Sequence, residues 1–490
     1  MSFLGMRLTD LKNPRIRTLH FAWMACFVSF LVWFSHAPLM IYIKQSLGLT
    51  DQEVMAILTL NVVLTIPARI LVGMLVDRWG PRAVYALLLL VSSVLCFWVA
   101  LAQNFEQMAL GRFALGVTGA GFVIGIRLVG EWFPAREVGL AEGIYGGWGN
   151  FGAAAAALVL PSVALLAGGE DGWRWAMTLT GLVALFYSGI FYRSVRNTPK
   201  GSTYFKPRKN GGLEVTSRND FFFYLAMNAP MYGVLGLMVW EFSGPSIGLL
   251  SEAAAQALIL GITVLFGLHA RQIHRVNREM LNEGVAEIYR YKFKQVAILD
   301  LAYMVTFGSE LAINSVLPLF YFTTFDGVTP IQAGILASAF ACMNLVARPA
   351  GGWLSDRLGR RRILSLLVGG LCVGHLTLSQ VSGEWPIALA VLATMVCAAF
   401  GQAGSGAVFA TVPLVRRRMT GQIAGMAGAY GNVGGVLFLT VYSFTDSSTF
   451  FMIVAASAAV ALLVIRFMDE PQGHLAEVRE DGTVELIEVA

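Results

Sequence analysis

Two arginines lie inside apolar stretches of this chain, and the sequence around them is repeated. The segment around Arg69 has its counterpart around Arg348, and alanine, arginine, glycine and aspartate recur in it at a constant offset of 279 residues. Each arginine precedes an aspartate, Asp77 or Asp356, by eight residues, which is roughly 12 Å along a helix. A charge that deep in a membrane helix costs at least ~2.5–3.5 kcal/mol and usually lines a substrate path. The repeat therefore predicts an anion site between two related halves.

The composition indicates a polytopic membrane protein. The chain has 490 residues, of which 56% are hydrophobic and 13% charged, and its mean hydropathy is +0.66. Soluble domains carry about 25% charged residues. The net charge of +5 is no evidence for a nucleic-acid partner, because the charges cluster between apolar stretches. The five cysteines all lie inside apolar stretches without metal-ligand spacing, so we expect neither a metal site nor a disulfide framework.

Apolar runs near the ~20 residues that cross a bilayer form two sets of six with a pair between them. The first set lies at about 19–43, 53–76, 83–103, 106–130, 140–166 and 174–193. The second lies at about 296–322, 331–354, 363–382, 385–412, 422–444 and 449–468, and the pair at about 220–243 and 247–270. We expect an all-α fold of about fourteen spanning helices, divided into two six-helix bundles (1–200 and 296–468), a central insert (201–295) and an acidic tail (469–490).

The distribution of lysine and arginine predicts the orientation. Basic residues precede the first run and follow the second and sixth, and in the second half they follow the counterparts of the second and fourth runs. The opposite loops are nearly bare. Both termini are therefore expected in the cytoplasm, with the chain in the plasma (inner) membrane. The first run is too long for a cleavable signal and is expected to be a spanning helix. The basic segment 271–295 is expected to lie as a helix along the anionic inner leaflet, and the tail to be disordered.

Two turns with one sequence pattern follow the second run of each half. They read Gly73-x-x-x-Asp77-Arg78-x-Gly80-x-Arg82 and Gly352-x-x-x-Asp356-Arg357-x-Gly359-Arg360-Arg361. The glycines allow helices to approach closely, and the charged residues can cap helix ends. Two such turns at equivalent positions resemble the signature loop of the major facilitator superfamily, which helps to gate its conformational change. The resemblance implies a gating role for Gly73, Asp77, Arg78, Gly352, Asp356 and Arg357.

Glycine-rich stretches mark the fifth expected helix of each half, at about 140–166 and 422–444. Residues 143–152 contain Asn150 and residues 425–434 contain Asn432, each directly after a glycine. Small residues at this density let backbones pack closely. The asparagine amides could donate to an oxyanion or serve only helix packing. Together with Arg69 and Arg348, the two stretches resemble the hallmark of the nitrate/nitrite porter family.

That resemblance implies the composition of the site. In the family, paired arginines hold nitrate or nitrite from opposite sides, and aromatic residues sandwich the planar ion. Carried over position by position, this implies an anion site made of Arg69, Arg348, Asn150, Asn432, Tyr303, Phe307 and Phe122. A guanidinium suits a planar, weakly hydrated anion because it is a permanently charged, planar fork of donors. No Asp or Glu lies in the neighbouring turns of either arginine, which disfavours a purely structural ion pair.

Further buried charges leave the coupling mechanism open. Glu310 stands near the middle of the first helix of the second half, at about 296–322, where the family's exchangers have an apolar residue. It therefore opens proton symport beside nitrate/nitrite exchange. It could equally be a carboxylate paired with a neighbouring helix or with one site arginine. Arg127, Glu131 and Glu142 lie near the cytoplasmic ends of the fourth and fifth helices and are expected to form a gate network.

The sequence favours a secondary active transporter over an enzyme. It contains no phosphate-binding loop and no cofactor fingerprint, so we expect neither an ATP-driven pump nor a cofactor. The duplicated gating turns favour an alternating-access machine over a channel or receptor. The expected partners are nitrate and nitrite, protons if Glu310 couples their movement, and membrane lipids, with no nucleic acid. The alternative function is a facilitator of another small organic anion.

Overall fold

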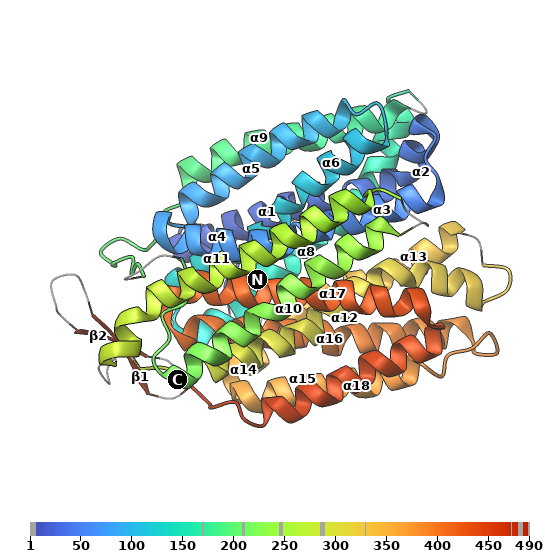
Figure 1. Cartoon of the computed structure of the whole chain (residues 1–490). Coiled ribbons are helices and arrows are strands. Elements are labelled where there is room, and N and C mark those ends of the chain that lie inside the picture. The colour runs from blue at the N-terminus through green and yellow to red at the C-terminus, as the bar shows by residue number, and fades with distance from the viewer. Residues whose placement is uncertain are drawn as a thin grey trace.

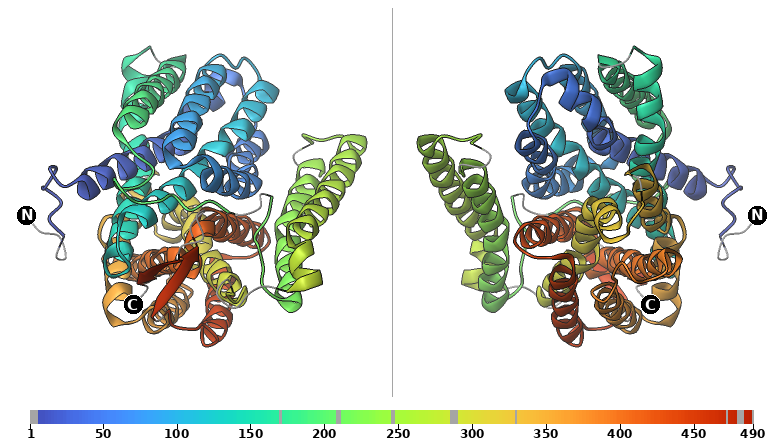
Figure 2. Two further views of the ribbon diagram at one scale, coloured as in Figure 1. Left: turned by 90° about the vertical axis from the view of Figure 1, so that its left-hand side faces the viewer. Right: turned by 90° about the vertical axis from the view of Figure 1, so that its right-hand side faces the viewer.

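Two bundles of long helices lie side by side. A separate pair of helices packs against one flank of both bundles (Figure 1, Figure 2). This computed structural model describes residues 6–168, 171–207, 211–244, 248–284, 290–328, 330–471, 473–478 and 484–488.

The first bundle contains six crossings, three of which are broken into shorter helices. They are α1 (Pro14–Phe34) with α2 (His36–Leu47), α3 (Asp51–Val63) with α4 (Thr65–Trp79), α5 (Pro81–Ala100), α6 (Phe105–Leu115) with the 3₁₀ turn η1 (Gly116–Ala120) and α7 (Gly121–Trp132), α8 (Ala135–Leu166), and α9 (Gly172–Ser194).

The second bundle repeats this order with fewer interruptions. Its crossings are α12 (Lys294–Thr324), α13 (Pro330–Cys342) with α14 (Asn344–Leu358), α15 (Arg360–Leu378), α16 (Ile387–Val415) with the 3₁₀ turn η4 (Arg417–Met419), α17 (Thr420–Phe444), and α18 (Ser447–Ile465).

The central insert supplies the remaining helices, α10 (Arg218–Ser243) and α11 (Glu252–Glu283). Thirteen segments of the described chain are long and apolar enough to cross a membrane. The broken crossing formed by α13 and α14 brings the number to the fourteen that the sequence predicts. The predicted all-α membrane fold is therefore confirmed.

Helix breaks recur at equivalent positions beside the two central arginines. The second crossing breaks at Leu64, five residues before Arg69, and its counterpart breaks at Met343, five residues before Arg348. Proline contributes to the irregularity, because it cannot donate the backbone hydrogen bond of a helix. Pro349 leaves the carbonyl of Leu345 without its helical donor, and the indole of Trp148 in the other half donates to that carbonyl at 3.2 Å. The breaks bring irregular, polar backbone to the level of the arginines.

The basic segment is helical over residues 271–283, as expected, and continues α11 without interruption to Glu283; residues 285–289 lie outside the described chain. The expectation for the tail is wrong. The tail is not wholly disordered, since β1 (His474–Val478) and β2 (Val484–Glu488) pair as an antiparallel hairpin. Val484 and Ile487 are β-branched residues, which favour strands, and the acidic composition of the tail does not reveal this local preference.

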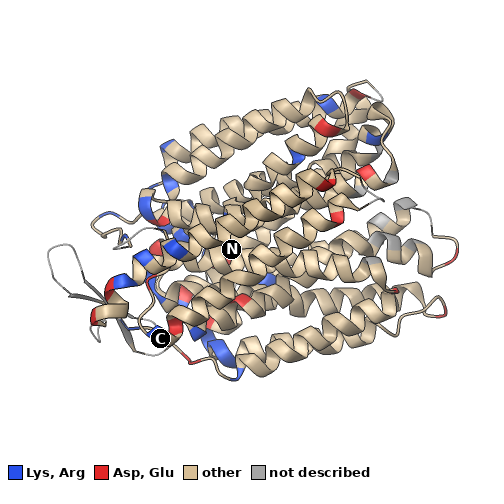
Figure 3. Ribbon diagram, viewed as in Figure 1, with Lys and Arg blue, Asp and Glu red and all other residues tan. Residues whose placement is uncertain are grey.

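The basic residues gather at the end of the molecule where the tail hairpin lies (Figure 3). This end also contains the C-termini of α4 and α14, with the turn glycines Gly80 and Gly359 at φ +84° and +97°. Both values lie in the left-handed region that glycine adopts without strain, which explains a glycine at each turn. We refer to this end as the gate end.

Candidate functional site

The two repeated arginines meet in the core between the bundles. Arg69 is fully buried, and Arg348 is 1% exposed. The Nε of Arg69 donates to the carbonyl of Gly119 at 3.2 Å, and its Nη1 donates to the carbonyl of Gly428 at 2.6 Å. Within the described chain, Nη2 of Arg69 and both Nε and Nη1 of Arg348 have no hydrogen-bond partner. Because buried donors are nearly always satisfied, these three nitrogens point to a ligand that supplies acceptors.

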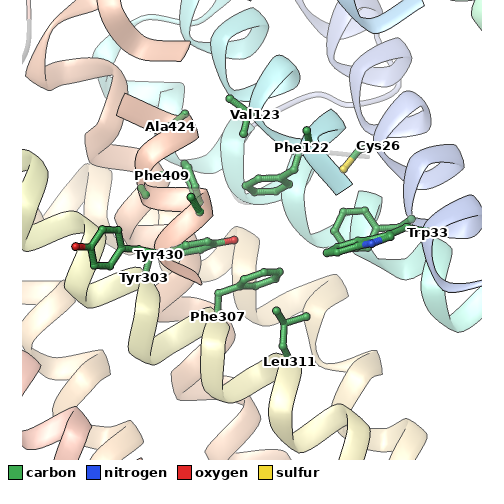
Figure 4. Close-up of a cluster of buried hydrophobic side chains, with 14 of the residues drawn as sticks. Cys26, Trp33, Phe122, Val123, Tyr303, Phe307, Leu311, Phe409, Ala424 and Tyr430 are labelled. Atoms are coloured by element: carbon green, nitrogen blue, oxygen red, sulfur yellow. The ribbon is translucent and has the colours of Figure 1, made fainter. Parts of the chain in front are cut away.

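Aromatic rings enclose both guanidinium groups. The ring centres of Phe122 and Phe307 lie 5.8 and 5.3 Å from the guanidinium carbon of Arg69, and both lie 5.6 Å from that of Arg348. The two rings thus contact both arginines. Figure 4 shows Phe122 of α7 and Phe307 of α12, one ring from each half, in the same buried cluster. Tyr303 stacks on Phe307 with ring centres 4.9 Å apart and 6° between the planes. The site is therefore a cationic centre with apolar, planar walls.

Two aromatic residues of this enclosure do not follow from the sequence pattern. The ring of Trp33 lies 5.8 Å from the guanidinium carbon of Arg69. The ring of Phe409 lies edge-on to Phe122 at 4.9 Å and to Tyr303 at 4.7 Å between ring centres, and so links one wall from each half. Neither residue stands in a motif of its own, and only the fold brings them to the site.

The glycine stretches support the arginines in a reciprocal manner. A Cβ atom added at Gly428 of α17 would lie 2.9 Å from Cδ of Arg69, which belongs to the other half. One added at Gly146 of α8 would lie 3.1 Å from Cδ of Arg348, again across the interface. Each half therefore provides the glycine surface against which the arginine of the opposite half packs. This arrangement requires the halves to be in close contact at the level of the site.

The two asparagines occupy equivalent places beside this surface. Asn150 is 8% exposed and Asn432 fully buried. Each stands four residues beyond the glycine that touches an arginine, on the same helix face. The Oδ1 of Asn150 and both amide atoms of Asn432 lack hydrogen-bond partners within the described chain. Unsatisfied buried amides are costly, so a ligand contact by the asparagines stays a prediction that this geometry favours.

Glu310 gives the site an asymmetric charge. Its Oε2 lies 3.8 Å from Nη2 of Arg348, and its Oε1 accepts a hydrogen bond from Nδ2 of Asn344 at 2.7 Å. Of the alternatives that the sequence left open for Glu310, the structure thus shows a pair with one site arginine, Arg348. The partner comes from another helix, α12, which inspection of the neighbouring turns cannot reveal. The same Nη2 of Arg348 lies 3.5 Å from the hydroxyl of Tyr303.

At the gate end, two aspartates, one in each half, accept hydrogen bonds from the backbone of the opposite half. The carboxylate of Asp77 accepts the N–H groups of Gly421 and Gln422, both at 2.9 Å, at the start of α17. The carboxylate of Asp356 accepts the N–H groups of Gly139 and Leu140 at 2.9 and 2.8 Å near the start of α8. Negative charge is favourable at helix N-termini. These bonds hold the two halves together at the gate end.

Glycine permits this contact on both sides of the interface. A Cβ at Gly73 would overlap the carbonyl oxygen of Gly421, and one at Gly352 would overlap that of Gly139. The arginine that directly follows the aspartate of each gating motif, Arg78 or Arg357, is instead exposed, and Arg357 lies over the ring of Trp353 at 4.8 Å. The glycine and the aspartate of each motif therefore make the contacts between halves.

An ionic cluster accompanies Asp77. The Nε of Arg127 lies 3.3 Å from its Oδ1, and Nη2 of Arg127 lies 3.0 Å from Oε1 of Glu131. Arg417 of the other half reaches Oε2 of Glu131 at 3.3 Å, and Arg127 donates to the carbonyl of Arg417. Arg127 and Glu131 thus lie together between the halves, as the sequence indicates.

Glu142 does not join that cluster. It lies seven residues into α8, close enough to Asp356 for the two carboxylates to interact electrostatically. Neither of its carboxylate oxygens has a hydrogen-bond partner within the described chain. The prediction that Glu142 shares one network with Arg127 and Glu131 is therefore wrong, because α8 turns away from α7 and carries Glu142 toward α14.

Sequence inspection also missed a contribution of the segment before α10. The hydroxyl of Tyr204 donates to the carbonyl of Val76 at 2.5 Å, and Nη2 of Arg127 donates to the carbonyl of Phe205 at 2.7 Å. The connection to the insert is therefore part of the gate-end contact. No charged motif marks these two residues, so only the fold reveals them.

Two further buried charges were overlooked although each stands alone in an apolar run. Arg112 is fully buried and donates to Oδ1 of Asn61 at 2.5 Å and to the carbonyl of Trp33 at 2.8 Å. Asp300 of α12 is also fully buried. A single charge in a spanning helix is itself the signal that could have identified both residues.

Comparison with known proteins agrees with this geometry. The family model described as Major Facilitator Superfamily matches residues 22–280 and 299–489. The chain is 42% identical to the nitrate/nitrite transporter NrtP of Picosynechococcus sp., with 96% of each chain covered. It is 41% identical to NrtP of Nostoc punctiforme, with 96% of this chain and 95% of that protein covered. The solved structure of the proton:xylose symporter XylE is similar in fold, with a TM-score of 0.60 and 15% identity over 93% of this chain and 96% of that chain.

Proposed function

Because the chain belongs to the major facilitator superfamily and, within it, to the nitrate/nitrite porters, we propose that it carries nitrate, nitrite or both across the membrane by alternating access. The observation that carries this proposal is the buried pair Arg69 and Arg348, which lie against the same two aromatic rings and have three guanidinium nitrogens without a partner in the described part of the chain. Nitrate and nitrite are small planar anions that offer acceptors in the plane of such donors. The aromatic walls of Phe122 and Phe307 favour a planar, weakly hydrated ion over a bulky one.

The charge of the site supplies a reason for coupled movement. Arg69 and Arg348 carry two positive charges, and ionised Glu310 offsets one of them. A monovalent anion then makes the site neutral, which allows the two halves to close around it. Protonation of Glu310 would leave a positive site that retains its anion more firmly, so movement of the anion and of a proton would depend on each other.

Replacement of Glu310 by glutamine tests that dependence. We expect Glu310→Gln to raise nitrate affinity about tenfold, or about 1.4 kcal/mol, because Arg348 loses its carboxylate partner. Net uptake driven by a proton gradient should fall while nitrate/nitrite exchange continues. Titration calorimetry and vesicle uptake measure the two effects, with Glu252→Gln at the exposed start of α11 as the matched control. Unchanged affinity in Glu310→Gln would contradict the proposed charge balance.

The gate-end contacts are proposed to close the inner side of the site. With both termini cytoplasmic in the plasma membrane, the gate end faces the cytoplasm. The halves 1–200 and 296–468 would rock about the central site, and the insert 201–295 would follow through its contact with Arg127. Asp77, Asp356 and the network around Arg127 must then release their partners before the anion can leave.

Loss of the Asp77 carboxylate should open this gate. We expect Asp77→Asn to shift the equilibrium toward the inward-open state by roughly ten- to a hundredfold, since hydrogen bonds to charged groups contribute about 1.5–3 kcal/mol. The measurement is alkylation from the gate side of a cysteine placed at the buried Ala424 in a cysteine-free background. Asp171→Asn, at an exposed position on the opposite end, is the control. Labelling at the wild-type rate would refute the gating role.

Uptake into proteoliposomes of purified protein tests the function itself. Nitrate is supplied outside, and the lumen is empty, loaded with nitrite, or buffered to give an inward proton gradient. Saturable uptake that requires internal nitrite indicates exchange, and uptake into empty vesicles driven by protons indicates symport. Competition by formate, acetate and lactate addresses the alternative, a facilitator of small organic anions. Transport of those anions without any transport of nitrate or nitrite would replace the proposed function by the alternative.

A further inference from the structure

The helix α12 carries a stripe of four polar and aromatic residues that begins below the anion site. Asp300, Tyr303, Phe307 and Glu310 stand at positions i, i+3, i+7 and i+10, which share one helix face. The stripe spans about 15 Å at the helical rise. Tyr303, Phe307 and Glu310 belong to the site already described, whereas Asp300 lies one turn nearer the gate end.

Asp300 is a buried acid without a partner. It is fully buried, and neither carboxylate oxygen has a hydrogen bond or ion pair within the described chain. Two titratable groups of the packed elements lie within electrostatic range of it, Tyr430 of α17 and Tyr224 of α10. The hydroxyl of Tyr430 is already bonded to the carbonyl of Met227 at 2.6 Å. An ionised, unpaired carboxylate in such surroundings is strongly unfavourable, so Asp300 holds a proton in this conformation.

The insert closes this region on the lipid side. The helix α10 contacts both α12 and α17 of the second half, and the bond from Tyr430 to Met227 fixes one of these contacts. A cavity of about 10 Å³ lies at the seam of α4, α10 and α17, lined among others by Met74, Tyr224, Asn228 and Gln422. That volume is near the minimum for one water molecule. The cavity shares Tyr224 with the surroundings of Asp300.

The cavity lies at the contact between α4 and α17, which is also the contact that must separate when the gate opens. Gln422 lines the cavity, and its backbone N–H group donates to the carboxylate of Asp77 of the other half at 2.9 Å. Met74 lies on α4, in the first half, and Gln422 on α17, in the second. Separation of α4 from α17 must therefore break the bond to Asp77 and enlarge the cavity in one movement. Water from the gate side would then reach Asp300.

We propose that Asp300 is a second proton-binding site of this protein, distinct from Glu310, which exchanges its proton with gate-side water when α4 and α17 separate. With α4 and α17 apart, protonated Asp300 gives its proton to gate-side water and becomes a carboxylate. A proton held by Glu310 then passes to that carboxylate by way of Tyr303, whose hydroxyl can both accept and donate, and Glu310 is left ionised beside Arg348. Asp300 is thus neutral again before α4 and α17 close, and one proton has entered for each one that Glu310 bound. This also gives the insert a function, which is to keep the acid away from lipid and bulk water.

The inference rests on the proposed function, and its test separates the two. Wild type, Asp300→Asn, Asp300→Glu and the control Asp446→Asn, which changes an exposed acid at the opposite end, are reconstituted with a pH indicator in the lumen. Nitrate/nitrite exchange, nitrate affinity and proton entry with nitrate are measured on the same vesicles. We expect Asp300→Asn to keep exchange and affinity within about twofold of wild type and to lose proton entry at least about tenfold, and Asp300→Glu to restore part of it.

Three outcomes would overturn the inference. They are proton entry at the wild-type level in Asp300→Asn, joint loss of exchange and proton entry in a variant with wild-type thermal stability, and nitrate uptake without proton entry in wild type. The unchanged affinity distinguishes Asp300 from Glu310, whose replacement is expected to raise it. Absence of nitrate and nitrite transport in wild type would instead refute the proposed function, and the inference with it.

Discussion

Replacement of either central arginine by lysine is expected to abolish saturable nitrate uptake and to weaken nitrate binding at least about a hundredfold, or about 2.7 kcal/mol. The geometry of Arg69 gives the reason. Two of its three nitrogens are bonded to the carbonyls of Gly119 and Gly428, and only Nη2 remains for a ligand. A lysine ammonium is a single point donor group, so it cannot hold both backbone carbonyls and an anion in one plane.

The Arg348→Lys variant should lose nitrate binding as Arg69→Lys does. The two alanine variants should differ in stability. Its carboxylate neighbour, Glu310, would remain buried and unpaired in Arg348→Ala, and such a change costs about 3–5 kcal/mol. Arg69 has no ion pair within the described chain, so Arg69→Ala should leave stability closer to wild type. Reduced thermal stability is therefore expected for Arg348→Ala, with recovery in the double variant that also carries Glu310→Gln.

Titration calorimetry with nitrate, vesicle uptake and thermal unfolding measure these effects. Arg466→Lys, which changes an exposed arginine beyond α18, is the matched control and should behave as wild type. Wild-type nitrate affinity in either central lysine variant would show that the anion binds elsewhere. Equal stability of the two alanine variants would show that the pair of Arg348 with Glu310 contributes little.

The residues of the central site could be predicted from the sequence because their motifs occur in both halves. The arginine motifs recur at an offset of 279 residues and the glycine–asparagine stretches at an offset of 282, so each half confirms the other. The rings of Tyr303 and Phe307 followed from the family resemblance, and the structure places both within the enclosure. A repeat shows which residues are equivalent. It does not show which half contacts which.

Several details depend on contacts between separate helices, which the sequence does not show. The sequence left open whether Glu310 pairs with a site arginine, and only the fold shows that the partner is Arg348; Tyr204 reaches the gate from a connection without any motif. Glu142 illustrates the opposite error, because nearness in the sequence to Arg127 suggested a contact that the direction of α8 prevents. Single buried charges such as Asp300 have no counterpart in the repeat, so symmetry could not point to them.

Alanine at the two cross-half glycines Gly143 and Gly425 is expected to abolish transport without preventing membrane insertion. A Cβ at Gly143 would lie 2.6 Å from the carbonyl oxygen of Arg348, and one at Gly425 would lie 2.6 Å from that of Arg69. Both contacts are with backbone, which cannot rotate away, so the helices must separate. Overpacking of this kind costs about 1–3 kcal/mol. This cost destabilises only the conformation in which the two halves are closed around the site.

The matched control is Gly189→Ala in α9, where an added Cβ meets nothing within 4 Å. Alanine there should be neutral or slightly stabilising, since it favours the helix over glycine by about 1 kcal/mol. Uptake, nitrate binding and the amount of folded protein are compared for the three variants. Normal uptake in either Gly143→Ala or Gly425→Ala would mean that the close approach of the halves is dispensable. Loss of uptake in both variants would show that a methyl group added to one half displaces the arginine-bearing helix of the other half, as the reciprocal packing requires.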